Sequence, residues 1–474
     1  MKNTDQLYQY EEEFRNSIGT VDEKGKRIWV YPKKPAGFFH NKRVLVTIIL
    51  LALFFSGPFI KINGQPFMLF NIFERKFIVF GQVFWPQDFV LLALTLITFF
   101  VFVILFTVVF GRVWCGWACP QTLFMEMVYR KIEYWIEGDA NQQRKLKAAP
   151  WTKEKIIKKG GKQIIFVSIA ILIAHTAMAY LIGLDQVIAI VQQPPAEHMA
   201  GFIGLVAFTG IFYFVFAWFR EQACIVVCPY GRLQGVLLGK ESIVVAYDWL
   251  RGEQRGKIKK NEPRLDKGDC IDCKLCVHVC PTGIDIRNGT QLECVNCTAC
   301  IDVCDDVMVK IDKPKGLIRF ASYNSIVNRV QQLWNPRVMG YSIVLTALLV
   351  LLSFMVFTRS PIETTLLKVP GTLFQKTDRG GVTNLYNIEF INKSFDDREL
   401  TIRVISPVET SLQLIGEPLI KLPAEQLVKR VIILELPAEA IKEAKTSIAL
   451  EVSEKGEVIE VVKTKFIGPV SIKK

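Results

Sequence analysis

The chain is poor in histidine, with only four in 474 residues, and His175 is the only histidine inside an apolar run. A haem held by two membrane histidines is therefore excluded, because the second axial ligand is absent. Acidic residues are also few, with 45 Asp and Glu against 58 Lys and Arg, which gives a net charge of +13. Such an excess is often a sign of nucleic-acid binding, but here the basic clusters alternate with apolar runs of about 20 residues, a pattern typical of a bilayer protein. We therefore expect a membrane protein with no nucleic-acid partner.

Five apolar windows are long enough to cross a membrane as helices, since about 17 to 25 residues span about 30 Å of hydrocarbon. The windows are Val44–Ile60, Asp88–Phe110, Gln163–Gly183, Gly201–Phe219 and Val338–Phe357. The first is not expected to be a cleaved signal peptide, because 43 residues rich in charge precede it and no small-residue cleavage site follows. The sequence thus predicts a multi-pass α-helical membrane protein with about five transmembrane helices.

The distribution of basic residues predicts the orientation of these helices. Lys and Arg number 9 in residues 1–43, 3 in 61–87, 11 in 111–162, none in 184–200 and 18 in 220–337. Because positively charged loops stay inside, the N-terminus and the two most basic loops are expected in the cytoplasm, and the tail outside. The predicted parts are a cytoplasmic N-terminal segment 1–43, helices one and two in 44–110, a cytoplasmic loop 111–162, helices three and four in 163–219, a cytoplasmic domain 220–337, helix five in 338–357 and an external domain 358–474.

The external tail has no cysteine and is rich in β-type residues. Partly alternating runs are separated by Pro, Gly, Asn and Asp, as in a chain of short strands. These runs are Asn384–Asn392, Glu399–Ser406, Val428–Leu436, Thr446–Ser453 and Glu457–Lys463. We expect a small β-sandwich without chemistry of its own.

All twelve cysteines fall in the predicted cytoplasmic segments or at cytoplasmic helix ends, where thiols stay reduced. Eight form two rows with C-x2-C-x2-C-x3-C spacing, the spacing of bacterial ferredoxins with two [4Fe-4S] clusters. In such modules the fourth ligand of each cluster comes from the other row. We therefore assign Cys270, Cys273, Cys276 and Cys304 to one cluster and Cys280, Cys294, Cys297 and Cys300 to the other. Paired zinc knuckles, which also use four thiolates, are the competing interpretation.

The other four cysteines form two C-x3-C-P motifs, Cys115 with Cys119 and Cys224 with Cys228, after the second and fourth windows. Spacing i, i+4 would place both sulfurs of a pair on one helical face, and the following prolines, Pro120 and Pro229, favour a helix end or kink. Soft thiolates suit Cu(I), and the two pairs together could form one site of four sulfurs. A dithiol–disulfide couple, a third iron–sulfur cluster and simple packing of small side chains remain alternatives.

Together these motifs resemble one family, the FixG/CcoG/RdxA-type cytochrome c oxidase accessory proteins of bacteria. The matching stretches are Tyr31-Pro32 with Gly37, Arg112–Gln121, Cys224–Arg232, Tyr247-Asp248 with Arg251–Glu253, both cysteine rows and Gly316–Arg319. The resemblance implies a protein of the bacterial inner membrane with a cytoplasmic two-[4Fe-4S] ferredoxin-like domain and a periplasmic immunoglobulin-like domain at the C-terminus.

The same resemblance implies a function in assembly of the cbb3-type oxidase through reduction of Cu(II) to Cu(I). Copper is then a substrate or bound ion, Cys115, Cys119, Cys224 and Cys228 are its ligands, and oxidase subunits or copper chaperones are partners. An oxidoreductase is thus the expected class, with an unidentified electron donor and a homo-oligomer among the allowed assemblies. Two other functions stay open. One is a quinol dehydrogenase similar to NapH or NosR, and the other is a non-enzymatic assembly scaffold.

Overall fold

The computed structural model describes residues 20–21, 24, 26–62, 64–73, 76–80, 82–85, 88–257, 267–371, 373–377, 380–394, 396–424, 426–441 and 443–469. Residues 1–19 of the predicted N-terminal segment lie outside this range. The chain forms two compact units. The first comprises residues 1–61, 66–75 and 92–352, and the second comprises 62–65, 76–91 and 353–474.

Five helical segments of the described chain are long and apolar enough to cross a membrane, and these confirm the multi-pass prediction. They are Phe38–Phe59 (α1, Phe38–Ser56, continued by η3, Gly57–Phe59), Phe89–Phe110 (α2), Lys153–Ile182 (α7), Met199–Phe219 (α9, Met199–Tyr213, continued by η6, Phe214–Phe219) and Pro336–Phe357 (α15). Large apolar side chains project outward from them: Ile48, Ile203 and Ile343 are 59%, 58% and 67% exposed. Such exposure is favourable against lipid rather than water.

Two of these helices begin at least six residues before their apolar windows. Helix α1 begins at Phe38 rather than Val44, and α7 begins at Lys153 rather than Gln163. An apolar window in the sequence ends at the first charged residue. A helix can continue through a charged residue when that residue forms an ion pair. Lys162, inside α7, forms ion pairs with Glu133 at 3.3 Å and Glu137 at 2.8 Å.

Short helices and loops of the first unit connect the long helices. These elements are α3 (Val113–Trp117), α4 (Pro120–Thr122), η5 (Leu123–Tyr129), α5 (Arg130–Ile136), α6 (Ala140–Ala148), α8 (Leu184–Gln192), η7 (Ala223–Val227) and α10 (Pro229–Leu237). Two of them, η5 and η7, are π-helical, as is η6 at the end of the fourth long helical segment. π-Helical turns are rare and are frequent at functional sites, and these three lie next to the two C-x3-C-P motifs.

The segment with both cysteine rows is a small domain held by a two-stranded antiparallel sheet. Strand β6 (Val244–Tyr247) pairs with β7 (Ile318–Ala321), and around them lie α11 (Trp249–Gly252), α12 (Leu275–His278), η8 (Ile286–Asn288), α13 (Ala299–Lys310) and α14 (Tyr323–Val327). The sheet and α13 share a buried core that includes Val245, Met308 and Ile318. This paired sheet brings the two ends of the cysteine segment together.

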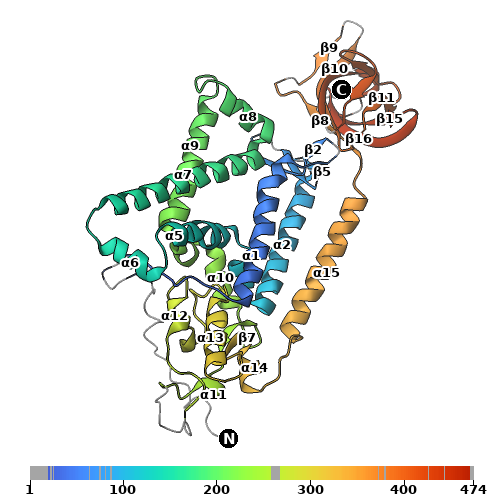
Figure 1. Ribbon diagram of the computed structural model, residues 1–474. Helices are drawn as coiled ribbons and strands as arrows, with labels where there is room; N and C mark the ends of the chain where they lie inside the picture. The colour runs from blue at the N-terminus through green and yellow to red at the C-terminus, as the bar shows by residue number, and fades with distance from the viewer. Residues whose placement is uncertain are drawn as a thin grey trace. The chain divides into compact units, whose positions relative to one another are not determined.

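Helix α13 docks on the N-terminal end of α1 (Figure 1). The carboxylate of Asp302 accepts hydrogen bonds from the backbone N–H groups of Phe39 at 3.0 Å and His40 at 2.7 Å. An acid at a helix N-terminus satisfies free N–H groups and complements the helix dipole. A Cβ at Gly37 would approach the Asp302 side chain to 2.4 Å, so glycine permits this contact. The cysteine domain is thereby joined to the first membrane helix.

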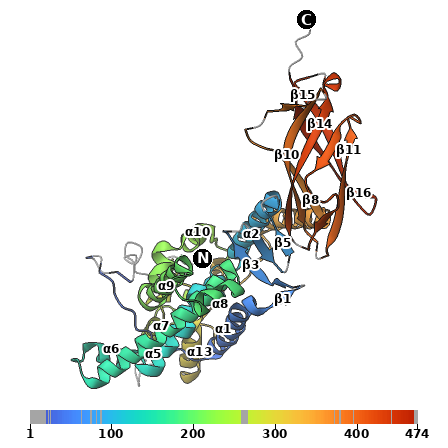
Figure 2. The same cartoon turned by 90° about the horizontal axis from the view of Figure 1, so that it is seen from above.

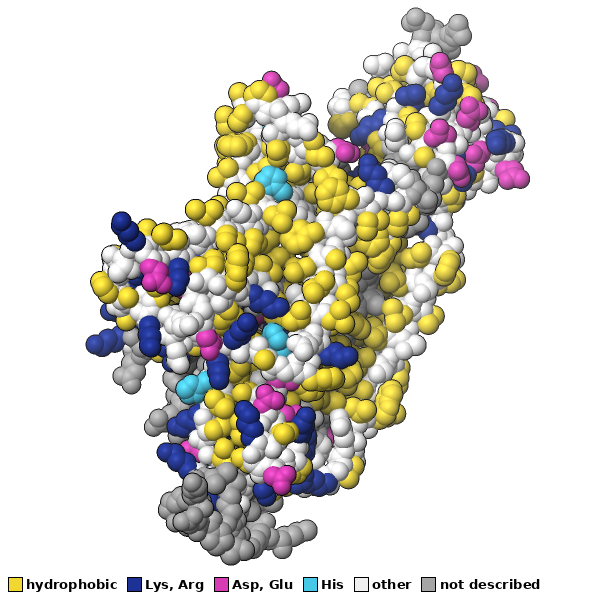
Figure 3. Space-filling model, viewed as in Figure 1, with side chains coloured by type: hydrophobic (Ala, Val, Ile, Leu, Met, Phe, Trp, Pro, Cys, Tyr) yellow, Lys and Arg dark blue, Asp and Glu magenta, His cyan; other side chains and the backbone are white. Residues whose placement is uncertain are grey.

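Hydrophobic and basic side chains are separated on the molecular surface. Figure 3 shows hydrophobic side chains over the long helices, while Lys and Arg gather towards the end that carries α6 and the cysteine domain. This segregation is the three-dimensional counterpart of the basic loops in the sequence.

The tail of the second unit is an all-β sandwich, as predicted (Figure 2). One sheet has the order β12 (Ser411–Leu414), β14 (Leu427–Pro437), β10 (Gly381–Asn392) and β8 (Ile362–Lys368), with β9 (Gln375–Lys376) also on β10. The other has the order β13 (Ile420–Leu422), β11 (Arg398–Ser406), β15 (Lys445–Glu454) and β16 (Glu457–Ile467). Alternate residues of β10, such as Tyr386, Ile388 and Phe390, are fully buried between the sheets. The five longest predicted runs all lie in these strands, and β8, β9, β12 and β13 were not predicted.

Five short strands lie between η3 and α2 in the chain: β1 (Lys61–Ile62), β2 (Gln65–Pro66), β3 (Met68–Asn71), β4 (Lys76–Val79) and β5 (Gln82–Phe84). Within the second unit, Asp88 forms ion pairs with Arg359 at 2.5 Å and Lys393 at 2.6 Å. The segment before α2 is thus tied to the tail.

Candidate metal centres

One cavity of the cysteine domain, of about 370 Å³, is lined by four thiols. These are Cys270, Cys273, Cys276 and Cys304. The remaining wall is mostly apolar and includes Leu275, Met308 and Leu317. Cys273 is exposed whereas Cys270 and Cys276 are buried, so this cavity lies near the surface on one side only.

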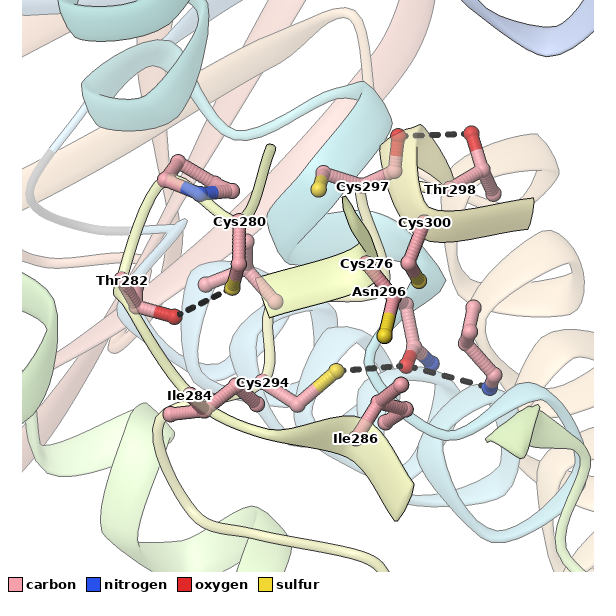
Figure 4. Close-up of a pocket in the computed structure, with 13 residues that line it drawn as sticks. Cys276, Cys280, Thr282, Ile284, Ile286, Cys294, Asn296, Cys297, Thr298 and Cys300 are labelled. Carbon is pink, nitrogen blue, oxygen red and sulfur yellow. Dashed lines mark hydrogen bonds between the residues drawn. The ribbon is translucent and has the colours of Figure 1, made fainter. Parts of the chain in front are cut away.

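A second cavity, of about 350 Å³, is lined by Cys276 and by four further thiols (Figure 4). The four are Cys280, Cys294, Cys297 and Cys300. Two sulfurs have polar neighbours: Cys280 Sγ lies 3.3 Å from Thr282 Oγ1, and Cys294 Sγ donates to Asn296 Oδ1 at 3.5 Å. The wall is otherwise apolar, with Ile284 and Ile286 among its residues. Such packing excludes water from the sulfurs.

The two cysteine rows have the same backbone conformation. Each has positive φ two and four residues after its first cysteine, at Asp272 and Lys274 in the first row and at Asn296 and Thr298 in the second. A short helix then begins, α12 at Leu275 or α13 at Ala299. The repeated left-handed positions turn three thiols of a row toward one point, and the helix carries the fourth toward the other cavity.

The thiols of both cavities match the ligands that iron–sulfur clusters use in proteins. Four thiols per cavity are the ligand set of a [4Fe-4S] cluster. The residues present therefore fit such a cluster in each cavity.

Burial sets the protonation of these thiols in the absence of metal. Desolvation raises the pKa of Cys276 and of Cys294 to about 12, and it raises the pKa of Cys300 and Cys304 strongly. Because the thiolate is the form that binds metal, cluster binding must displace these protons.

The C-x3-C-P pairs do not lie on continuous helices, which corrects the expectation from i, i+4 spacing. Cys115 lies in α3, but that helix ends at Trp117, and Cys119 has extended backbone (φ −63°, ψ 123°). Cys224 lies in η7, and Cys228 is likewise extended (φ −67°, ψ 112°). The proline after each second cysteine forces this, since it disfavours helical backbone before it and is well suited to the first position of the next helix.

The four membrane-edge thiols, Cys115, Cys119, Cys224 and Cys228, nevertheless lie close together. Burial and, to a lesser extent, the other three thiols raise the pKa of Cys224 to about 12. Burial likewise raises the pKa of Cys115 to about 11, although a hydrogen bond to Gln234 Oε1 at 3.5 Å and the charge of Arg112 oppose the shift. The two motifs, more than a hundred residues apart, thus form one group of sulfurs, here called the membrane-edge thiols.

This group abuts the second cavity. A Cβ at Gly116, next to Cys115, would approach the backbone oxygen of Val295 to 2.4 Å and that of Asn296 to 2.9 Å. The Arg43 Nε donates to the carbonyl of Gly116 at 2.6 Å. Arg112 donates to the carbonyls of Gly231 and Leu292 and, at 3.4 Å, of Cys294. The loop of the first motif is thus packed directly on the second cysteine row.

Sequence reasoning did not single out Arg43 and Arg112 as site residues. The available signal was their position, because each charge lies within two residues of an apolar window, and an ionisable residue at membrane depth is a functional candidate by default. The sequence could not reveal that both side chains turn inward, since 3% and 6% exposure results from packing by distant segments.

Comparison with known proteins agrees with this architecture. Three family models match: a 4Fe-4S dicluster domain over residues 219–323, a 4Fe-4S binding domain over 92–138, and the IG-like fold at the C-terminal of FixG over 352–469. Together with the five apolar helices and the cysteine cavities, they define a membrane-bound iron–sulfur protein of ferredoxin type with an immunoglobulin-like domain.

The chain is 34% identical to protein RdxB of Cereibacter sphaeroides, over 86% of this chain and 89% of that protein. It is 32% identical to RdxA of the same organism, over 79% and 82%, and 29% identical to nitrogen fixation protein FixG of Rhizobium meliloti, over 84% and 83%. The chain belongs to the FixG/RdxA-type family, as the sequence motifs predicted.

Proposed function

We propose that this protein is a membrane-bound electron-transfer protein that reduces Cu(II) to Cu(I) in the assembly and copper delivery of a cbb3-type cytochrome c oxidase. The observation that carries the proposal is the packing of the Cys115 loop on the second cysteine row, with Gly116 against Val295. Thiols suited to copper thereby lie next to a cysteine row suited to an iron–sulfur cluster. Reduction of Cu(II) to Cu(I) needs one electron, which such a cluster can supply.

Two [4Fe-4S] clusters are assigned to the two cavities, one to Cys270, Cys273, Cys276 and Cys304 and the other to Cys280, Cys294, Cys297 and Cys300. Such clusters supply one-electron transfer when bound. The protein contributes the thiol ligands, the apolar wall that excludes water, and hydrogen bonds at the sulfurs. Cys276 lines both cavities, which supports electron exchange between them.

The membrane-edge thiols are proposed to take the substrate copper. Thiolates are soft ligands that favour Cu(I) over Cu(II), so binding there would itself favour reduction. Since no three of the described acid, His or Cys side chains converge on a single-ion position, the proposal rests on pairs of thiolates rather than on all four sulfurs around one ion.

We place the protein in the bacterial inner membrane with the N-terminus and every cysteine on the cytoplasmic side. The immunoglobulin-like domain, from residue 358 onward, is then periplasmic. The distribution of Lys and Arg between the apolar windows supports this orientation. Oxidase subunits or copper chaperones are the proposed partners, alongside an electron donor yet to be identified and a homo-oligomeric assembly.

One observation favours the quinol dehydrogenase as a second candidate. A cavity of about 980 Å³ opens among the membrane helices, and its mostly apolar wall includes Phe55, His175, Thr176 and Gln192. The Nδ1 of His175 is hydrogen-bonded to the carbonyl of Ile171 at 2.7 Å, which leaves Nε2 to bind a hydroxyl group. A quinol headgroup with an apolar tail matches this mixture of polar and apolar groups.

The deciding experiment uses anaerobically purified, dithionite-reduced protein and Cu(II), with a Cu(I)-specific chelator as reporter. Reduction of copper by the wild type, and its loss when all four membrane-edge cysteines are replaced by Ala while the cluster spectra persist, would support the proposal. If a quinol reduces the clusters and Cu(II) does not reoxidise them, the quinol dehydrogenase is favoured. If loss of the clusters leaves the copper content of the oxidase unchanged in cells, the scaffold function is favoured.

A further inference from the structure

Arg43 and Arg112 are buried cations that lack an acidic partner. Both are more than nine-tenths buried, and neither forms an ion pair with any carboxylate of the described residues. Other buried arginines of this unit are paired: Arg130 with Glu126 at 2.6 Å, Arg220 with Glu133 at 2.6 Å and Arg287 with Asp285 at 2.6 Å. Among the buried arginines of the described residues, only Arg43 and Arg112 lack an acid, whereas Arg287, which lines the first cavity, pairs with two.

The hydrogen bonds of the two guanidinium groups are also incomplete. Both terminal nitrogens of Arg112 donate hydrogen bonds to backbone carbonyls, those of Gly231, Leu292 and Cys294, while its Nε is buried without a hydrogen-bond partner. The Nε of Arg43 donates a hydrogen bond to the carbonyl of Gly116, while one terminal nitrogen, Nη2, is buried without a hydrogen-bond partner. Neutral carbonyls satisfy a donor but do not compensate a charge, and an uncompensated buried charge is strongly unfavourable.

Thiols of both sulfur groups lie close to these cations. The charge of Arg112 acts on both Cys115, a membrane-edge thiol, and Cys294, a thiol of the second cavity. The charge of Arg43 acts on Cys297, also of the second cavity, while its Nε binds the loop of Cys115. Arg112 therefore contacts the backbone next to both thiol groups, while Arg43 contacts the backbone of the Cys115 loop and acts electrostatically on the second cavity.

We propose that Arg112, assisted by Arg43, is the shared counter-cation of the second-row site and the membrane-edge thiols, and that it couples the charge of one site to that of the other. This inference rests on the proposed iron–sulfur function but not on the identity of the metal at the membrane edge. Metal–thiolate groups carry net negative charge, which supplies the missing partner of both arginines. Arg112 is thus a positioning and tuning residue, because it acts through the thiols and their loops.

Two consequences follow from a cation held between two anionic sites. A reduced site carries one more negative charge than an oxidised one, so the nearby cation stabilises the reduced form and raises the reduction potential. When one site gains or loses negative charge, its attraction for the guanidinium group changes, and a shift of that group towards or away from the other site changes the potential there. The potential of the second-row site should therefore depend on whether the membrane-edge thiols are intact.

The test uses full-length holoprotein and the variants Arg112→Gln, Arg112→Lys and Arg43→Gln. Arg319→Gln is the matched control, because it removes the same charge from the same unit at an arginine that pairs with Asp248 at 2.9 Å. Iron per chain is measured first, and the two reduction steps are then followed by potentiometric titration with electron paramagnetic resonance.

We expect Arg112→Gln and Arg43→Gln to move one reduction step to a more negative potential and to leave the other in place, with Arg112→Lys close to wild type in potential. Arg319→Gln should move neither step. Unchanged steps in both Gln variants at wild-type iron content would overturn the inference, as would an equal shift in the control. Should Arg112→Gln not retain iron, Arg43→Gln and Arg112→Lys decide the outcome.

Coupling is tested by combining Arg112→Gln with Cys115→Ala. In the wild-type background, Cys115→Ala should shift the same reduction step, and in the Arg112→Gln background it should shift that step less. Additive shifts would contradict the shared counter-cation. Absence of iron from the wild-type protein would instead refute the proposed function, so the two failures are distinguishable.

Discussion

Arg220 and Glu133 form a buried bidentate ion pair, with Nη1 donating to Oε2 at 2.9 Å and Nη2 donating to Oε1 at 2.6 Å. It joins the end of the fourth membrane helix to α5, a segment 87 residues earlier. Lys162 of α7 also contacts Glu133, at 3.3 Å. Planar guanidinium–carboxylate pairs of this kind are directional, so the network orients the chain that leads into the second C-x3-C-P motif.

Replacement of Glu133 by Gln should destabilise the protein by about 3 to 5 kcal/mol, because it leaves Arg220 and Lys162 buried without a full counter-charge. Thermal unfolding in detergent would measure the loss. Glu154→Gln is the control, since Glu154 makes a solvent-exposed pair with Lys158, and loss of such a pair should hardly change stability. Equal effects of the two substitutions would contradict the buried-network interpretation.

The same ion pair predicts a pH dependence. Burial alone would raise the pKa of Glu133, but Arg220, Lys162 and Arg130 outweigh it and lower the pKa to about 2 from 4.5. A lowered pKa means that the stabilisation is present above pH 4.5 and is lost as the pH falls toward 2, by about 3 kcal/mol in total. The difference in unfolding midpoint between wild type and Glu133→Gln should therefore shrink over this interval, and a constant difference would argue against it.

Gly116→Ala should separate the Cys115 loop from the second cysteine row. A Cβ there would lie 2.4 Å from the oxygen of Val295, a backbone atom that cannot move aside easily. We expect a loss of about 1 to 3 kcal/mol in stability and slower copper reduction at unchanged iron content. Gly160→Ala is the control, because nothing lies within 4 Å of its added carbon and alanine favours a helix. If both variants reduce copper like the wild type, close packing of the loop is not needed for the reaction.

Substitution of one ligand in each cavity should remove about half of the bound iron. Cys273→Ala tests the first cavity and Cys300→Ala the second. Iron and acid-labile sulfide per chain give the stoichiometry, and electron paramagnetic resonance shows which signal is lost. Complete loss of iron in both variants would mean that the two cavities load only together, whereas no loss would exclude these cysteines as ligands.

Asp88→Asn should loosen the second unit. Asp88 is buried and pairs with Arg359 and Lys393, whose charges keep its pKa below the usual value although burial opposes this shift. Its neutralisation leaves two cations without their shared acid, and we expect faster proteolysis near Arg359 at unchanged iron content. Lys429→Gln, at an exposed lysine paired with Glu389 at 2.6 Å, is the control. Equal cleavage rates in both variants and the wild type would show that the Asp88 contacts do not hold the tail.

Much of the fold could be predicted because its signals are local. The five apolar windows and the β-type runs of the tail depend on length and alternation along the chain, and both recur in the structure as α1, α2, α7, α9 and α15 and as β10, β11, β14, β15 and β16. The apolar windows did not predict where α1 and α7 begin. The start of α1 contacts Asp302 and the charged first part of α7 pairs with α5, and both partners lie far away in the sequence.

For the metal centres, the sequence by itself determined the number of thiols and their spacing, and hence the chemistry they favour. The tertiary structure decided which thiols share a cavity with which apolar wall, that the C-x3-C helices break before the second cysteine, and that Gly116, Arg43 and Arg112 connect the membrane-edge thiols to the second row. The physical reason is range: spacing within a row is a property of adjacent residues, whereas burial and charge compensation are set by segments that meet only when the whole chain packs.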